Sequence, residues 1–164
     1  MKNQNPSYSL LAKTLHWGFV IAFAYGIFKA VENIDQLENS AFLRFEVLFA
    51  SAFLFMLAAR YLYMKKTQKT SLPLKTRKLQ RFAAKIVHLG MYATLTTIAL
   101  TGLIIGFLFH MGLKDGVLIE SLIAIHEFGI PVMYWLIGIH VIAAVFHRLL
   151  RDGVWNSMVP FWKE

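Results

Sequence analysis

The sequence predicts an all-α integral membrane protein, an up-and-down four-helix bundle with both termini on the cytoplasmic side. Three observations support this fold class. Hydrophobic residues make up 57% of the chain and charged residues only 16%, against roughly 45–50% and about 25% in soluble domains. The apolar residues gather in four stretches, each long enough for the roughly 20 residues that cross a bilayer core. The basic residues concentrate at one set of ends of these stretches.

The four spans are predicted, in chain order, at residues 11–31, 42–64, 82–110 and 118–149. Because short connections join successive spans, neighbouring helices are expected to run antiparallel. Residues 65–81 are polar and basic and include Pro73, which predicts a cytoplasmic loop between the second and third spans. We expect residues 1–164 to form a single transmembrane domain.

The distribution of basic residues predicts the orientation of the bundle. If the N-terminus is cytoplasmic, 14 of the 17 lysines and arginines lie on the inner side, and only Lys29, Arg44 and Lys114 lie outside. We therefore expect a multi-pass protein of the cytoplasmic membrane, in contact with membrane lipid and with both termini inside. The net charge of +8 does not indicate nucleic-acid binding, because the basic residues lie at helix ends and not along one helix face.

Six histidines are the first candidates for function, because ionisable side chains at membrane depth usually mark a functional site or a buried partner. His126 and His140 lie 14 residues apart on one predicted helix. At 100° per residue their directions agree to within about 40°, and at 1.5 Å per residue they are roughly 21 Å apart. One is therefore expected near each leaflet, and both face into the bundle.

His16 lies just inside the inner end of the first span, at a depth that matches His140. Haem iron takes two axial ligands, and two neutral imidazoles on facing helices provide them in a four-helix bundle. We therefore expect His16 and His140 to bind one haem b. Zinc needs three or four clustered ligands, which histidines four turns apart cannot supply. Without a haem, these histidines would hydrogen-bond to Ser, Thr or backbone groups of neighbouring helices.

Several motifs occur in a fixed order along the chain. They are Leu15-His16-Trp17, Arg60 near the end of the second span, His88-Leu89-Gly90-Met91-Tyr92, His126-Glu127, and Gly138-Ile139-His140 followed by His147. In these motifs the chain resembles the bacterial cytochrome b561 family, and it is similar to the cytochrome b subunits of formate dehydrogenase and nickel–iron hydrogenase. The resemblance covers nearly the whole chain. It implies a four-helix b-type cytochrome of the bacterial inner membrane, with an inner haem bound by His16 and His140.

The family pattern also implies an outer haem between His126 and a histidine early in the second span. Fourteen residues before Arg60, where that histidine is usual, this chain has Glu46, and its second span contains no histidine. Three arrangements remain open. Glu46 ligates the iron or hydrogen-bonds to a water on it, His110 serves as the replacement ligand, or the site is empty and Glu46 pairs with His126. We expect a second haem b with His126 as its ligand.

His88 and His147 lie towards the inner side, beside the expected inner haem. In the superoxide-oxidising members of the family that the chain resembles, these positions lie near bound ubiquinone. A quinone head group needs hydrogen-bond donors and a source of protons, and imidazole offers both. Lys85, one turn before His88, would extend a proton relay. Alternatively, His88 anchors its helix end and His147 extends to the membrane interface.

Together these features predict a membrane b-type cytochrome that moves electrons from a donor at the outer face to membrane quinone. By resemblance superoxide is one candidate donor, which would make the protein a superoxide:quinone oxidoreductase. The acidic outer loops argue against superoxide, since they would repel that anion. The alternatives are a cytochrome b anchor subunit that docks a redox partner protein, and a haem-free transporter or scaffold.

Overall fold

The computed structural model describes all residues except 1–6, 30, 32, 68–71, 74–75 and 164. Its long helices are α1 (Leu10–Phe28), α2 (Ser40–Thr67), α3 (Lys78–His110) and α4 (Val117–Leu150). A 3₁₀ helix, η1 (Ile34–Glu38), follows α1, and a short helix, α5 (Val154–Met158), follows α4. No strand occurs among the described residues. All four long helices are apolar enough to cross a membrane, so the predicted all-α membrane four-helix bundle is confirmed.

The observed helix ends differ from the predicted ones by a few residues. The first span was predicted to reach residue 31, whereas α1 ends at Phe28. The inner ends of the second and third spans were placed too early and too late, because hydropathy detects only the part of a helix that lies inside the hydrocarbon. α2 continues to Thr67 and α3 already begins at Lys78. The loop predicted at 65–81 is therefore shorter, and residues 68–71 and 74–75 of it lie outside the described residues. α3 and α4 contain 33 and 34 residues, which makes each about 50 Å long, against about 30 Å for the hydrocarbon core. Their polar ends therefore extend into the membrane interface.

Side-chain caps mark where the first two long helices begin. The Ser9 hydroxyl accepts a hydrogen bond from the Ala12 backbone N–H at 3.2 Å and lies 2.8 Å from the Tyr63 hydroxyl. The Asn39 side-chain oxygen accepts from the N–H groups of Ala41 and Phe42. Such caps satisfy donors of the first turn that have no partner inside the helix. The contact of Ser9 with Tyr63 also fixes the start of α1 against the end of α2.

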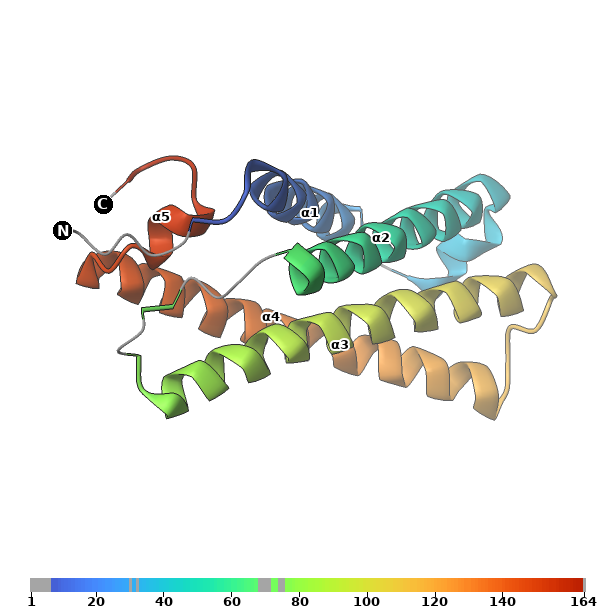
Figure 1. Ribbon diagram of the computed structural model, residues 1–164. Helices are drawn as coiled ribbons and strands as arrows, with labels where there is room; N and C mark the ends of the chain where they lie inside the picture. Colours follow the sequence, from blue (N-terminus) through green and yellow to red (C-terminus); the bar gives the residue numbers. More distant parts are fainter. Residues whose placement is uncertain (1–6, 30, 32, 68–71, 74–75, 164) are drawn as a thin grey trace.

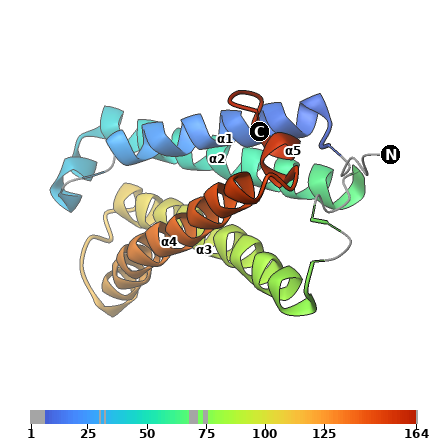
Figure 2. The same ribbon diagram turned by 90° about the vertical axis from the view of Figure 1, so that its left-hand side faces the viewer.

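The helices form two pairs that cross as two layers. α1 packs along α2 and α3 packs along α4, while contacts between α2 and α3 join the layers (Figure 1). Figure 2 shows α1 and α2 together above the crossing pair of α3 and α4. The two ends of the chain meet at one end of the bundle, where the Tyr8 backbone N–H donates to the Ser157 carbonyl over 3.3 Å. Four spans therefore return the chain to the side on which it started.

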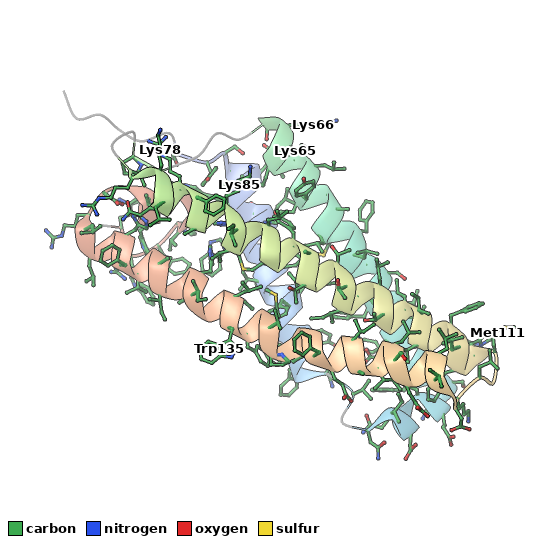
Figure 3. The ribbon with its side chains drawn as sticks, turned by 90° about the horizontal axis from the view of Figure 1, so that it is seen from below. Lys65, Lys66, Lys78, Lys85, Met111 and Trp135 are labelled. Atoms are coloured by element: carbon green, nitrogen blue, oxygen red, sulfur yellow. The ribbon has the colours of Figure 1, made fainter. Side chains whose placement is uncertain are left out.

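Two apolar clusters divide the interior along the length of the bundle. The central cluster consists of Phe19, Phe53, Leu57, Leu95, Ala99 and Met133. The cap cluster, beside η1, consists of Leu37, Ile105, Leu108, Phe109 and Ile119. Many other large apolar side chains point outward, among them Trp135, which stands on the outside of α4 in Figure 3. An apolar exterior of this kind is the surface that lipid tails cover.

Candidate functional site

Three histidines from three helices converge on one side of the central cluster. His16 lies on α1, His88 on α3 and His140 on α4. The ring centroids of His16 and His140 are 6.4 Å apart, and those of His88 and His140 are 5.0 Å apart. The structure thus brings His16 and His140 together, as the match in depth predicted, and it adds His88 as a direct neighbour of His140. We call these three residues the inner histidine cluster.

The Arg60 side chain of α2 lies against the inner histidine cluster. Its Nη2 is 2.8 Å from Nδ1 of His16, and its guanidinium carbon lies 5.7 Å and 5.6 Å from the ring centroids of Phe19 and Tyr92. A guanidinium can only donate, so Nδ1 of His16 accepts, and the ring proton of neutral His16 lies on Nε2. Arg60 Nε is buried without a hydrogen-bond partner among the described residues. The site therefore offers an unused donor on a buried cation, which suits an anionic group.

The distances between the three rings show which pair of histidines could bind one metal ion from opposite sides. An imidazole nitrogen bonds a metal ion at about 2 Å and lies roughly 1 Å from its ring centre, so two imidazoles on opposite sides of one ion have centroids about 6 Å apart. The 6.4 Å between His16 and His140 matches this separation, whereas the 5.0 Å between His88 and His140 is too short. Within the described part of the chain no three His, Asp or Glu side chains could hold a bare metal ion.

His88 is held in a single tautomer by its own helix. Its Nδ1 lies 2.6 Å from the Ala84 carbonyl oxygen. Because a carbonyl only accepts, the proton of neutral His88 is on Nδ1, and Nε2 presents a lone pair. His88 can therefore accept a hydrogen bond or a proton at Nε2 without breaking its bond to the backbone.

The second candidate site is a cavity of about 340 Å³ enclosed by all four long helices. Ligand pockets typically have volumes of about 300–1,000 Å³. Members of both apolar clusters line it, so it lies between the centre of the bundle and the capped end. Its few polar lining residues are Glu46, His126, Glu127 and Tyr134. A mostly apolar cavity with a carboxylate and an imidazole suits a large, flat, apolar cofactor that needs a ligand at its centre.

Glycines keep this cavity open. Gly26, Gly102 and Gly106 line it. A Cβ atom on Gly102 would lie 3.3 Å from Cε1 of His126, and one on Gly106 would lie 2.9 Å from Cγ2 of Val47. A side chain at either position would therefore press on its neighbour and take up space beside the imidazole.

His126 is oriented by a hydroxyl on the neighbouring helix α3. The Thr101 Oγ1 lies 3.1 Å from His126 Nδ1 and donates its own hydrogen to the Thr97 carbonyl over 2.7 Å. With its one hydrogen already used, Thr101 accepts from His126, so Nδ1 of His126 carries the proton and Nε2 has a lone pair. Metal-bound histidines usually donate their second ring N–H to an oxygen in this way. His126 is therefore prepared to ligate through Nε2.

Glu46 reaches the same cavity from α2 but makes no visible bond to His126. Its Oε1 is buried and has no hydrogen-bond partner among the described residues. Of the three arrangements considered for this site, a direct pairing of Glu46 with His126 is not found there. An unpaired carboxylate oxygen at such depth is costly unless a donor or cation in the cavity meets it.

The other predicted site residues lie outside these two places. His110 is exposed at the end of α3 and is absent from the described lining of the cavity. His147 pairs with Asp152, with 2.6 Å between Nδ1 and Oδ2, and its ring packs against Phe146 and not against the inner histidine cluster in the described part of the chain. Lys85 is exposed and lies at the same end of the bundle as Lys65, Lys66 and Lys78 (Figure 3).

Three features of the sites were missed by sequence reasoning. The contacts of Arg60 with His16 and of Thr101 with His126 join different helices, and no motif signals them. The third is Pro131, which lies inside α4 between His126 and His140. Proline lacks a backbone N–H, so the Glu127 carbonyl has no donor from the next turn of the helix. This third feature could have been found in the sequence, because a proline five residues after His126 lies inside the predicted fourth span.

A family model, Ni_hydr_CYTB, described as prokaryotic cytochrome b561, matches residues 7–161. No curated protein and no solved structure matches the chain.

Proposed function

Because the chain belongs to the prokaryotic cytochrome b561 family of membrane b-type haem electron-transfer proteins, we propose that it passes electrons from an outer-face donor to quinone at the inner leaflet. The observation that carries this proposal is the pair of His16 and His140, which come from α1 and α4 and whose ring centroids lie 6.4 Å apart, a separation suited to one haem iron. The family assignment sets aside the haem-free transporter or scaffold.

The inner histidine cluster offers a haem b two imidazoles and a buried cation. His16 and His140 would hold its iron, and the apolar side chains of the central cluster would pack against it. Arg60 offers a buried cation with an unused Nε donor to a propionate carboxylate of the cofactor. A bound b-type haem supplies one-electron oxidation and reduction at its iron.

The cavity around His126 fits a second haem b. His126 presents the Nε2 lone pair needed for ligation, and Thr101 fixes the orientation of its ring. The described lining of the cavity holds no second histidine, so we propose that Glu46 would ligate the iron or hydrogen-bond to a water on it. This assignment would give the unpaired Oε1 of Glu46 a partner. His110 is the less suitable replacement, because it lies outside the cavity lining.

The chain's own residues would keep water away from the path between the two sites. Four buried side chains of the central cluster, Phe53, Leu95, Ala99 and Met133, line the cavity, and Phe19 of the same cluster lies against Arg60 at the inner histidine cluster. A region without water prevents protons and oxygen from reaching the redox centres through the protein. The electron path would therefore run from the cavity with His126, past the central cluster, to His140 and His16.

His88 is the residue best placed to serve a quinone. Its Nε2 accepts while Nδ1 remains bound to the Ala84 carbonyl, so it can take up a proton and return it to a reduced quinone. Lys85, one turn away and exposed, is a second proton carrier on the same helix. His147 and Asp152 form a further proton-holding pair on α4. We propose that these groups serve ubiquinone at the inner leaflet.

We propose that the end of the bundle that bears α5 is cytoplasmic. Lys65, Lys66, Lys78 and Lys85 gather there, while Met111 lies at the opposite end (Figure 3). Excess lysine and arginine marks the cytoplasmic side of a membrane protein. The family assignment indicates a bacterial membrane.

Spectroscopy of the purified protein tests the proposal. We expect a low-spin b-type absorbance spectrum in the dithionite-reduced protein and two haems per chain by pyridine haemochrome assay. The His140→Ala variant should lose the inner haem, whereas His110→Ala, which changes a histidine outside both sites, should retain both. A colourless preparation made with ample porphyrin, or an unchanged His140→Ala spectrum, would contradict the assignment.

The acidic outer loops favour a second candidate function. Glu32, Asp35, Glu38, Asp115 and Glu120 are predicted on the outer side, where they would repel superoxide but attract a basic surface of a protein. In this case the chain would be the cytochrome b anchor subunit of a multi-subunit dehydrogenase. Co-purification of a large soluble redox subunit, released by high salt, would support the anchor function.

A further inference from the structure

The C-terminal segment forms a small basic pocket that the electron-transfer function does not use. After α4, the chain turns through α5 and folds back beside the end of the helix (Figure 1). The pocket has a volume of about 250 Å³ and is lined by Arg148, Leu149, Arg151 and Lys163. Three of its four lining residues are cations. We call it the hook pocket.

Hydrogen bonds hold this segment in place. The Trp17 indole N–H donates to the Met158 carbonyl over 3.2 Å, and the Trp155 indole N–H donates to the Trp162 carbonyl over 3.0 Å. The first bond ties the segment to α1, and the second folds the part that carries Lys163 back towards α5. Lys163 is thereby brought near two arginines that precede it in the chain by 12 and 15 residues.

The cations of the hook pocket are also individually positioned. The guanidinium carbon of Arg148 lies 5.0 Å from the ring centroid of Trp155, a cation–π contact that orients the side chain. Arg151 has φ 51° and ψ 42°, and Trp162 has φ 50°. These left-handed conformations are costly for residues other than glycine, and such strain is often found where a ligand is held.

The described lining of the hook pocket contains no acidic side chain. Among the described residues the acid nearest to the pocket in sequence is Asp152, and both of its oxygens are already engaged. Its Oδ2 lies 2.6 Å from His147 Nδ1, and its Oδ1 accepts from the Val154 backbone N–H at 3.1 Å. Three cations that share a pocket repel one another, so an anion in the pocket would relieve that repulsion.

The chemistry around the hook pocket points to an anion with a hydrophobic tail. Leu149 lines the pocket and is 77% exposed, and Trp162, beside Lys163, is 70% exposed. α4 is a membrane span, so its end lies at the level of the lipid head groups. Basic pockets at this depth bind the phosphate groups of anionic lipids. We propose that the hook pocket binds the phosphate of an anionic phospholipid through Arg148, Arg151 and Lys163, with Leu149 and Trp162 against the acyl chain.

Native mass spectrometry of the purified full chain in neutral detergent tests this proposal. Phosphatidylglycerol and phosphatidylcholine would be titrated separately against the wild type and two variants. One variant is Arg148→Gln/Arg151→Gln/Lys163→Gln. The matched control is Lys65→Gln/Lys66→Gln/Lys78→Gln, which removes the same charge from the same end of the bundle but outside the pocket.

We expect the wild type to prefer phosphatidylglycerol, the pocket variant to bind it roughly a hundredfold more weakly, and the control to change by less than about threefold. An equal loss in both variants, or no preference between the lipids in the wild type, would overturn the proposal. Displacement of phosphatidylglycerol by excess inorganic phosphate would show that free phosphate is the ligand, and the lipid assignment would be wrong.

A single substitution keeps the test decisive if the triple variant does not fold. Arg151→Gly removes one cation and places glycine where φ is positive, so the local backbone is relieved and not disturbed. It should weaken phosphatidylglycerol binding roughly fivefold. Unchanged binding by this variant would show that Arg151 is not a ligand, contrary to the proposal.

Discussion

Arg60 donates a hydrogen bond from Nη2 to Nδ1 of His16, over 2.8 Å, between two helices of the bundle. The bond requires a lone pair on Nδ1, and neutral His16 then carries its proton on Nε2. A histidine that ligates iron through Nε2 carries its proton on Nδ1 instead. Haem binding by His16 would therefore break this bond and leave Arg60 free to turn towards an anionic group of the cofactor.

Replacing Arg60 should lower the midpoint potential of the inner haem. Reduction removes one positive charge from the iron, so a neighbouring cation stabilises the reduced form. Loss of the cation in Arg60→Leu should shift the potential down by on the order of 50–100 mV, given Coulomb's law at an effective dielectric near 20. Arg60→Lys keeps the charge and should shift it much less. Redox titration at the reduced absorbance band measures both, and an unchanged or raised potential in Arg60→Leu would contradict the contact.

A histidine at position 46 should convert the outer site into a bis-imidazole site. Glu46 and His126 line the same cavity, and His126 Nε2 has its lone pair free. Glu46→His should therefore increase the low-spin signal of the outer haem in electron paramagnetic resonance and reduce any high-spin signal. Glu46→Gln, which is close in size but lacks an imidazole, should leave the spin state unchanged. The same spectrum for both variants would show that position 46 does not face the iron.

Gly102→Ala should disturb the outer site and spare the inner one. The new methyl group would lie 3.3 Å from Cε1 of His126, so the imidazole would have to shift by a few tenths of an ångström. We expect a several-fold loss of outer haem with no change in the absorbance of the inner haem. Gly90→Ala on the same helix meets only Leu136, at 3.4 Å, and serves as the control. Equal losses of outer haem in both variants would indicate a general effect of alanine on α3.

The sequence predicted the four helices, and it singled out the histidines as candidates, because both depend on patterns along one chain. The hydrophobic stretches identified α1–α4, and the 14-residue spacing put His126 and His140 at two depths. The missed features depend on how helices pack against each other. Arg60 could not be assigned to His16, nor Thr101 to His126, without knowing which faces of α1, α2, α3 and α4 meet. The helix ends at Thr67 and Lys78 were missed because a helix can continue into the polar interface, where hydropathy gives no signal.

The ion pair between Glu38 and Lys114 should stabilise the fold near neutral pH and lose this effect as the pH falls. Lys114 Nζ lies 2.7 Å from Glu38 Oε1, on the loop side of the bundle opposite α5, and this hydrogen bond and charge lower the pKa of the Glu38 carboxyl. A lowered pKa in the folded state stabilises the fold above the ordinary pKa of glutamate, and this contribution is lost as the pH falls through the lowered value. Lys114→Gln should return the pKa to its ordinary range, and Lys114→Arg should keep it low. NMR titration of labelled glutamate measures this, and a pKa unaffected by Lys114→Gln would rule out the pair in solution.

Arg151→Gly should make the protein more stable, although it removes a basic residue from the hook pocket. Arg151 ends α4 in a left-handed conformation, with φ 51°. Relief of that strain is worth about 1–2 kcal/mol, and the greater freedom of glycine in the unfolded chain offsets about 0.5–1 kcal/mol of it. The net gain of roughly 0.5–1 kcal/mol should raise the melting temperature measured by circular dichroism in detergent.

Arg148→Gly, inside the helix, should instead cost about 1 kcal/mol. Both variants lose one positive charge, but Arg148→Gly also loses the cation–π contact with Trp155, so it is the rise for Arg151→Gly that would identify strain at Arg151. A lower melting temperature for both variants would show that the arginine side chain stabilises this turn by more than its backbone strain.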